Sequence, residues 1–414
     1  MSSPTGNSDD SAESSLSGTV DNQKSVYVIA AAIGVTSASY NLWYPFLPLY
    51  ALELGATSDA NAVFWMSIAL TAQGIGRLAS SAIWGMLSDR LGRKMMLLRA
   101  VFLGTLTFFF AALAQEPWHL SIALFCQGIF SGFVPASVAL VSVIVPDSRL
   151  NRSLSLVTGG QHLGTTTGPA LGAALAALLS YRVSIAVAAF VPILAGIAIW
   201  LLVPRDKVAR RSSDASTSSQ EQAEPFRMSR QFKLALGALF AVYCMNELIK
   251  ISTPIALKGL KGSENVTSEA GLAFVLAGLV SAISVLFLAP RVFRGIPSGP
   301  PFALICGVGS VGFLLVALAG SVAVYILGFL TIFLAISAMV PALNTLIAAN
   351  VRRSRRGTAF GVAGTFQAMA FGVGPLTGAF FAAVSLDAGF VAVALLFLTL
   401  GFTLFTWVRQ PQPL

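Results

Sequence analysis

The sequence predicts an all-helical integral membrane protein with twelve transmembrane helices in two pseudo-symmetric six-helix bundles. Composition is the first observation: of the 414 residues, 56% are hydrophobic and only 10% are charged, and the mean hydropathy is +0.79. A soluble domain of this length needs more charges to cover its surface. Second, apolar runs long enough to cross a ~30 Å hydrocarbon core recur along the whole chain. Third, several motifs recur at one interval, which indicates an internal repeat.

Twelve apolar runs are the predicted spans, and lipid admits them because a helix satisfies its own backbone hydrogen bonds. They cover residues 26–50, 63–84, 95–114, 118–145, 154–179, 183–203, 232–257, 271–289, 301–319, 322–349, 358–384 and 387–408. The Ser- and Gln-rich segment 204–231 follows the sixth span and predicts a cytoplasmic linker. It divides the chain into an N-terminal bundle over 26–203 and a C-terminal bundle over 232–409.

Both ends of the chain are expected outside the bilayer. Residues 1–25 are rich in Ser and Asp and lack the basic start of a signal peptide, so we expect a disordered tail, and 410–414 form a second, short tail. The predicted loops on one side of the membrane carry 21 Lys and Arg residues, and those on the other carry only Arg182, Lys258 and Lys261. The positive-inside rule therefore places both termini and the linker in the cytoplasm.

An internal repeat is visible in the prolines. Residues 206 positions apart match in four cases: Pro48 and Pro254, Pro135 and Pro341, Pro169 and Pro375, and Gln161 and Gln367. Many transporters are built from such repeats, with the substrate site between the halves near the bilayer midplane. Prolines inside spanning helices permit bending, which suits two bundles that rock about a central site.

Charge placement and cysteine spacing exclude several other classes. The formal charge of +9 lies in short loops, without the aromatic-interleaved basic patch that binds nucleic acid. Cys126, Cys244 and Cys306 all lie in apolar runs and show neither disulfide-framework nor metal-site spacing. We therefore expect no metal and no cofactor. We also expect no enzyme, because the sequence shows no cluster of catalytic His, Asp or Cys at a membrane face.

The loop between the second and third spans carries the most specific motif. It reads Gly85-Met-Leu-Ser-Asp89-Arg90-Leu-Gly92-Arg93-Lys94, and it resembles the signature loop of the major facilitator superfamily, G-x-L-x-D-R-x-G-R-K, at every defining position. Gly85 permits close backbone approach, and Asp89 can face a helix N-terminus or pair with Arg93. The resemblance implies the major facilitator fold, with this loop as a cytoplasmic gate latch that is closed in the outward-facing state.

The fifth span carries a second motif, Gly164-Thr-Thr-Thr-Gly168-Pro169-Ala-Leu-Gly172. It resembles the antiporter motif of the twelve-helix drug:proton antiporter group of the superfamily, with Ala173 in place of the last Gly. The resemblance favours export over uptake. Small residues on one helix face also allow close packing, so tight helix packing alone is the alternative interpretation.

The resemblance to that group covers nearly the whole chain, and three positions depart from it. Leu124 stands where the family often has an arginine in its fourth helix. The second copy of the loop motif is reduced to Ala289-Pro290-Arg291-Val-Phe-Arg294-Gly295 and has no aspartate. Asn41 stands where many cation exporters carry a carboxylate in the first helix. The chain therefore lacks the commonest family arrangement for proton coupling.

Titratable groups inside a membrane are costly and are functional candidates. Glu247 and Lys250 are three residues apart on the seventh span, so they share a helix face with Tyr243. Glu247 is the only carboxylate predicted deep in the core. A buried carboxylate beside a cation can be poised to exchange a proton, so Glu247 is the predicted proton-coupling residue. The alternative is a static ion pair with Lys250 that only fixes the helix.

Two further titratable residues lie within predicted spans. Arg77 on the second span either faces the central cavity, where it attracts an anionic substrate, or extends to the cytoplasmic interface. His162, just before the fifth-span motif, is a second candidate for proton coupling or a hydrogen-bonded packing residue. The predicted substrate-binding residues are Asn41, Tyr44, Arg77, Gln127, Tyr243, Asn246, Lys250, Asn344 and Gln367.

These features predict a monomeric secondary transporter of a bacterial inner membrane that exports a small molecule by proton antiport with alternating access. Two buried cations against one carboxylate favour anionic or zwitterionic substrates, such as a siderophore, an organic acid, a phosphonate or a drug of that charge. The expected partners are this substrate, protons and the lipid bilayer. A proton-coupled or facilitative importer is the alternative. A non-transporting membrane sensor is a remote one, because the 204–231 linker is too short to fold alone.

Overall fold

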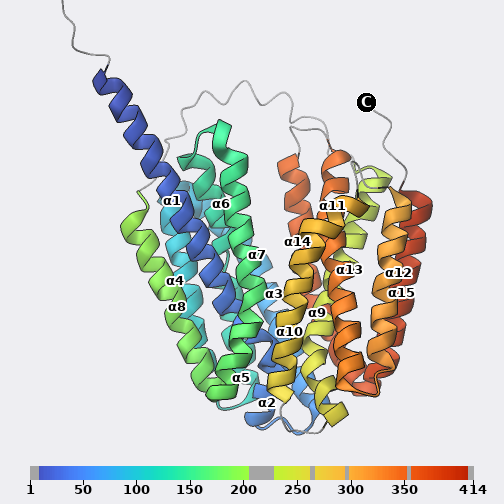
Figure 1. Cartoon of the computed structure of the whole chain (residues 1–414). Helices are drawn as coiled ribbons and strands as arrows, with labels where there is room; N and C mark the ends of the chain where they lie inside the picture. Colours follow the sequence, from blue (N-terminus) through green and yellow to red (C-terminus); the bar gives the residue numbers. More distant parts are fainter. Residues whose placement is uncertain (1–8, 205–227, 262–265, 294–297, 352–355, 409–414) are drawn as a thin grey trace, which may run out of the picture.

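The computed structural model of the chain is built from helices in two side-by-side bundles (Figure 1). It describes residues 9–204, 228–261, 266–293, 298–351 and 356–408, and no strand occurs among them. The N-terminal bundle contains α1 (Asp9–Leu42), η1 (Tyr44–Phe46), α2 (Leu47–Glu53), α3 (Asp59–Leu91), α4 (Arg93–Ala112), α5 (Pro117–Phe130), α6 (Phe133–Ile144), α7 (Asp147–Leu178) and α8 (Tyr181–Leu202). The C-terminal bundle contains α9 (Arg230–Lys261), α10 (Val266–Ile283), η2 (Ser284–Leu288), α11 (Ala289–Val292), α12 (Gly299–Ala317), α13 (Val322–Ala349), α14 (Arg356–Val384) and α15 (Leu386–Trp407).

The number of helices long enough to cross a membrane is consistent with the twelve predicted spans. Ten segments of the described chain are long and apolar enough to cross a bilayer, with α5–α6 and α10–α11 each forming one of them. α3 and α7 are two further helices of spanning length, with 33 and 32 residues. They are less apolar because they carry the polar residues of the two motifs. The total is consistent with twelve spans.

The N-terminal segment differs from the expected disordered tail. α1 begins at Asp9 and continues without interruption into the first span, whose apolar part is Gln23–Leu42. Each residue added to an existing helix gains one backbone hydrogen bond and needs no new nucleation. The first spanning helix can therefore extend into the polar segment before it. The predicted tail 410–414 and most of the predicted linker lie outside the described residues.

The 206-residue repeat extends from the motifs to the helix ends. α4 and α12 begin 206 residues apart, at Arg93 and Gly299, and α7 and α14 end 206 residues apart, at Leu178 and Val384. Each half also has a hydrophobic core of its own, one centred on α9–α15 and the other on α1–α8. The two bundles are therefore repeats of one six-helix unit.

One helix pair breaks this symmetry. The N-terminal bundle interrupts its fourth span between α5 and α6, where Gly132 has a φ of +113°, whereas α13 runs continuously through the matching Ala338. Both spans contain the repeated proline, Pro135 or Pro341. The glycine rather than the proline therefore makes the break, because only glycine adopts this positive φ at little cost.

Contacts between the bundles gather at one end of the molecule. We call the end where α8 stops and α9 starts the linker end, and the other the opposite end. The described polar contacts are Ser67 Oγ to Pro375 O (2.6 Å), Thr71 Oγ1 to Gly372 O (2.6 Å), Lys258 Nζ to Asp59 Oδ1 (2.6 Å) and Tyr181 Oη with Thr267 Oγ1. All of them lie in the first half of α3, the second half of α14 or the loops and helix ends beyond. Toward the linker end the two bundles diverge (Figure 1).

Candidate functional site

Three polar side chains of the N-terminal bundle form a hydrogen-bonded triad. Tyr44 Oη donates to Gln127 Oε1 at 2.5 Å, and Gln73 Nε2 donates to both Tyr44 Oη and Gln127 Oε1. Gln127 is only 1% exposed, and its Nε2 has no hydrogen-bond partner. The triad therefore joins three elements, η1, α3 and α5, and it keeps one donor unused.

Two glycines bring α3 and α5 close enough for this triad. A Cβ added at Gly128 would lie 2.1 Å from Gln73 O, and one added at Gly76 would lie 2.6 Å from Phe125 O. Neither position can accept a larger residue unless the helices separate, as is typical of small residues at membrane helix crossings. The crossing point places Gln73 and Gln127 side by side.

The C-terminal bundle contributes an ion pair. Lys250 Nζ lies 3.0 Å from Glu247 Oε1, one turn along α9, and the two side chains are 27% and 14% exposed. α14 packs directly against this turn, since a Cβ added at Gly374 would lie 3.0 Å from Glu247 Cβ. Both partners keep some accessible surface, so the pair is not sealed inside the bundle.

Arg77 links the two bundles. Its guanidinium lies 5.7 Å from the ring centroid of Phe371 on α14, and the Phe371 ring is 6.0 Å from Tyr243 on α9. Tyr243 lies one helical turn before Glu247 on α9. Arg77 Nε is buried and has no hydrogen-bond partner. These contacts favour the interpretation in which Arg77 faces the centre over the one in which it extends to the interface.

The remaining predicted substrate-binding residues take less central places. Asn41 Nδ2 donates to Ser37 O of its own helix at 2.8 Å. Asn246 Oδ1 is buried without a partner. Asn344 lies on α13 and Gln367 on α14, and among the described residues no hydrogen bond joins either of them to the triad or the ion pair. His162 belongs to α7, but its side chain lies outside the part of the chain that the structure describes.

The predicted latch residues are described in part. Gly92 is the N-cap of α4 with a φ of +93°. Arg93 Nη1 donates to Ala139 O at 2.8 Å, and Lys94 Nζ donates to Trp200 O at 2.8 Å, so these two side chains tie α4 to α6 and α8 of the same bundle. The surroundings of Gly85 and the side chains of Asp89 and Arg90 lie outside the part of the chain that the structure describes.

The glycines of the fifth-span motif pack α7 against α1. Cβ atoms added at Gly164, Gly168 and Gly172 would lie 1.9, 2.4 and 1.8 Å from backbone oxygens of α1, and the motif's Pro169 is buried beside them. The contacted oxygens belong to Gly34, Ala38 and Leu42, which are also four residues apart. The motif is thus a close-packed helix interface. Its relation to export stays a prediction.

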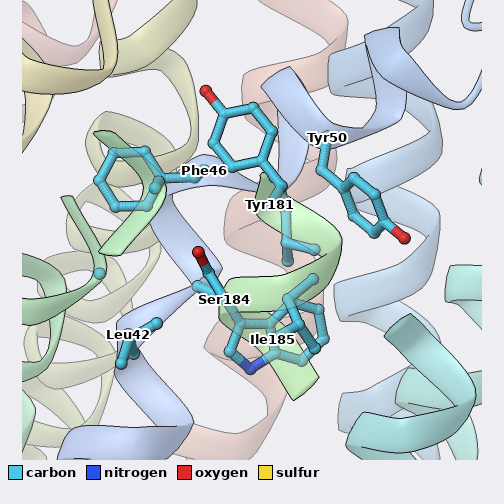
Figure 2. Close-up of a pocket in the computed structure, with 10 residues that line it drawn as sticks. Leu42, Phe46, Tyr50, Tyr181, Ser184 and Ile185 are labelled. Carbon is cyan, nitrogen blue, oxygen red and sulfur yellow. The ribbon is translucent and has the colours of Figure 1, made fainter. Parts of the chain in front are cut away.

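A pocket lies in the N-terminal bundle at the opposite end, where Figure 2 shows Phe46, Tyr50 and Tyr181 around it. Its lining is Leu42, Trp43, Phe46, Leu47, Tyr50, Gly172, Ala176, Tyr181, Ser184 and Ile185. No residue of the triad or of the ion pair lines it, and neither does Arg77. We therefore place the candidate site at the triad, Arg77 and the ion pair, not in this pocket.

Two polar residues of the bundle interior were missed by the sequence reasoning. Gln73 completes the triad, and the signal was its position one helical turn before Arg77. Arg99 was counted among the loop charges near the start of α4, although its guanidinium stacks on Trp84 at 3.6 Å inside the bundle. Its position five residues after the end of the loop motif gave no sequence signal of this.

Comparison with known proteins decides the family. The family model of the Major Facilitator Superfamily matches residues 29–375. The chain belongs to the major facilitator superfamily. It is therefore a multi-pass membrane transporter and not an enzyme. Among curated superfamily members, the chain is 30% identical to "Multidrug resistance protein MdtG" of Proteus mirabilis (strain HI4320) over 403 residues, covering 94% of this chain and 97% of that protein. It is also 30% identical to the protein of that name from Escherichia coli O9:H4 (strain HS), covering 92% of each.

Solved superfamily structures share the fold. A bacterial homologue of the human lysosomal transporter Spinster, in an inward-facing and unoccupied conformation, superposes with a TM-score of 0.73 at 15% identity, covering 95% of this chain and 99% of that one. The human organic anion transporter MFSD10 (TETRAN) superposes with a TM-score of 0.66 at 18% identity, covering 92% and 99%. At these identities the likeness shows the fold alone.

Proposed function

We propose that this transporter exports an anionic or zwitterionic small molecule from the cytoplasm in exchange for protons. The observation that carries the proposal is the contact of Arg77, from the N-terminal bundle, with Phe371 of the C-terminal bundle, whose ring lies 6.0 Å from that of Tyr243, one turn before Glu247 on α9. A cation that lacks a partner at one nitrogen attracts a negatively charged substrate group. A carboxylate in the same region can take up a proton in its place. One region thus contains a group for each of the two exchanged species.

Export rather than import is supported by two observations. The curated relatives are named multidrug resistance proteins, and α7 carries the antiporter-like motif. If the basic loops face the cytoplasm, the linker end is the cytoplasmic end, and the inter-bundle contacts close the external side. An exporter loads its substrate in this conformation. The protein acts in this proposal as a monomer in the inner membrane, with both termini in the cytoplasm.

The role of Glu247 is coupling, and those of Arg77 and the triad are substrate recognition. Lys250 holds Glu247 while it is ionised, and protonation releases that pair. Such a switch biases the packing of α9 against α14, which is a bistable element of the kind that transporters require. Asp89, Arg90 and Arg93 act as the cytoplasmic latch. We therefore expect replacement of Asp89 by Asn to impair flux in the vesicle assay below while membrane insertion and expression stay near normal.

Flux into inverted membrane vesicles tests the function. The vesicle interior is made acidic, and uptake is measured for citrate-type siderophores, organic acids and phosphonates, with ethidium and tetraphenylphosphonium as cationic comparisons. The proposal expects uptake of an anionic or zwitterionic compound that stops when the pH gradient is dissipated. Accumulation of the substrate in intact cells that overexpress the protein would instead indicate an importer.

A further inference from the structure

At the break between α5 and α6 lies a cation, Arg99, with two nitrogens that lack hydrogen-bond acceptors. Arg99 Nη2 donates to Ser131 O at 3.3 Å, and the guanidinium stacks on the Trp84 ring at 3.6 Å. A Cβ added at Gly132 would lie 4.0 Å from Nη2. The other two nitrogens, Nε and Nη1, are buried and have no hydrogen-bond partner. Leaving two N–H donors of a charged group unbonded inside a protein is costly.

A second unsatisfied donor adjoins the same break. Tyr40 is 4% exposed, and its hydroxyl has no hydrogen-bond partner. Its ring centroid lies 5.1 Å from that of Phe133, the first residue of α6. A Cβ added at Gly104 would lie 2.0 Å from the Tyr40 hydroxyl oxygen and 3.9 Å from the carbonyl oxygen of Phe130, the last residue of α5. α6 itself has no side-chain cap at its N-terminus, so its first backbone N–H groups also favour negative charge.

All these unsatisfied groups can donate hydrogen bonds, and the charge at the break is positive. Among the described residues, no carboxylate pairs with Arg99. The complement of several donors and one positive charge is a compact anion with several acceptor oxygens. The arrangement is not a requirement of the fold, because Ile305 on α12 and Ala338 on the continuous α13 stand at the matching positions of the other bundle.

We infer that Arg99, Tyr40 and the N-terminus of α6 form a binding site for a carboxylate or phosphate-like group. Arg99 is partly exposed, so an anion can reach it. The site deepens the proposed function, since it rests on an anionic substrate whose acidic group binds at the helix break while Arg77 acts nearer the other bundle. Interrupted helices whose ends face a ligand are a recurring feature of transporter sites. A free inorganic anion offers the same chemistry.

Titration of the purified full-length protein tests the site. Tryptophan fluorescence and the unfolding midpoint are followed against sodium citrate and sodium phosphate, with chloride holding ionic strength constant. We expect saturable binding of at least one of the two anions. Arg99→Gln should weaken it about tenfold or more, the usual loss for hydrogen bonds to a charged group, and Tyr40→Phe about threefold. Arg149→Gln removes the same charge from an exposed position of the same bundle and should leave it unchanged.

Several outcomes separate the inference from its alternatives. Citrate binding assigns the site to carboxylate groups of a substrate, and binding of phosphate alone assigns it to a free anion. Binding that neither Arg99→Gln nor Tyr40→Phe weakens, or no saturable binding above chloride, overturns the site. Tyr40→Phe keeps the test valid if Arg99→Gln fails to fold. If the unmodified protein binds the anion but shows no gradient-driven flux, the proposed export is wrong and the inferred binding site is still supported.

Discussion

The two bundles share one helical plan and differ in the polar groups they place at the centre. The N-terminal bundle has Gln73, Arg77 and Gln127 there; the residues 206 positions later are Leu279, Ile283 and Phe333. The C-terminal bundle has the Glu247–Lys250 pair, and 206 positions earlier stand the neutral Asn41 and Tyr44. The repeat therefore supplies the scaffold, while Arg77 lies in one half and the Glu247–Lys250 ion pair in the other.

Packing differs between the bundles in a related way. α7 approaches α1 through three glycines, and at the positions matching Gly164 and Gly168 in α14 stand Ala370 and Gly374. The Cβ added at Gly374 would lie 2.7 Å from Cys244 O, against 1.9 Å for Gly164 and Gly34 O. α1 and α7 are thus the more tightly fixed pair. The looser α9–α14 pair is the one that carries Glu247.

The largest expected effect follows from this packing difference. Gly164→Val should force α1 and α7 apart and lower the free energy of unfolding by about 3 kcal/mol, at the upper end of overpacking costs. Gly159→Val is the matched control on the same helix, because a Cβ there meets nothing within 4 Å. Thermal unfolding in detergent compares the two. Equal midpoints for both variants would contradict the close packing of the motif.

A second prediction concerns the cationic side of the comparison. Arg77→Gln should weaken binding of the anionic substrate about tenfold, since it removes a charge-assisted hydrogen bond. Binding of a neutral analogue should change little. Competition binding to the purified protein measures both. The assignment of the N-terminal bundle to anion recognition would be wrong if ethidium or tetraphenylphosphonium bound tightly and Arg77→Gln left the substrate affinity unchanged.

The smallest effect is expected where the bundles meet. Asp59 and Lys258 are 41% and 29% exposed, so their pair contributes less than about 1 kcal/mol. Asp59→Lys should slow transport a few-fold by loosening the opposite end. The double exchange Asp59→Lys with Lys258→Asp should restore most of the rate. Transport rates of the unmodified protein, the single variant and the double exchange check this. A double exchange no faster than the single variant would show that the pair does not hold the opposite end closed.

Sequence patterns predicted the fold well because lipid imposes a strong constraint on helix length and polarity. The family, the all-helical architecture and the two-bundle repeat were confirmed, and Tyr44 and Gln127 were named before their contact was known. Gln73 and Arg99 were missed because their roles depend on which helices cross. A charge near a helix end is the same in sequence whether it faces water or a neighbouring tryptophan. The break at Gly132 was missed because glycine is common in spans, and only the backbone shows the positive φ.

The division of labour between the bundles is tested most directly at Glu247. Purified protein in proteoliposomes is assayed for uptake driven by a pH gradient and for exchange of labelled against unlabelled substrate without a gradient. We expect Glu247→Gln to lose gradient-driven uptake, to below about a tenth of the unmodified rate, and to retain exchange. Glu53→Gln, at an exposed carboxylate of α2, should retain both. Continued pumping against a gradient by Glu247→Gln would contradict the assignment and make His162 the next candidate for coupling.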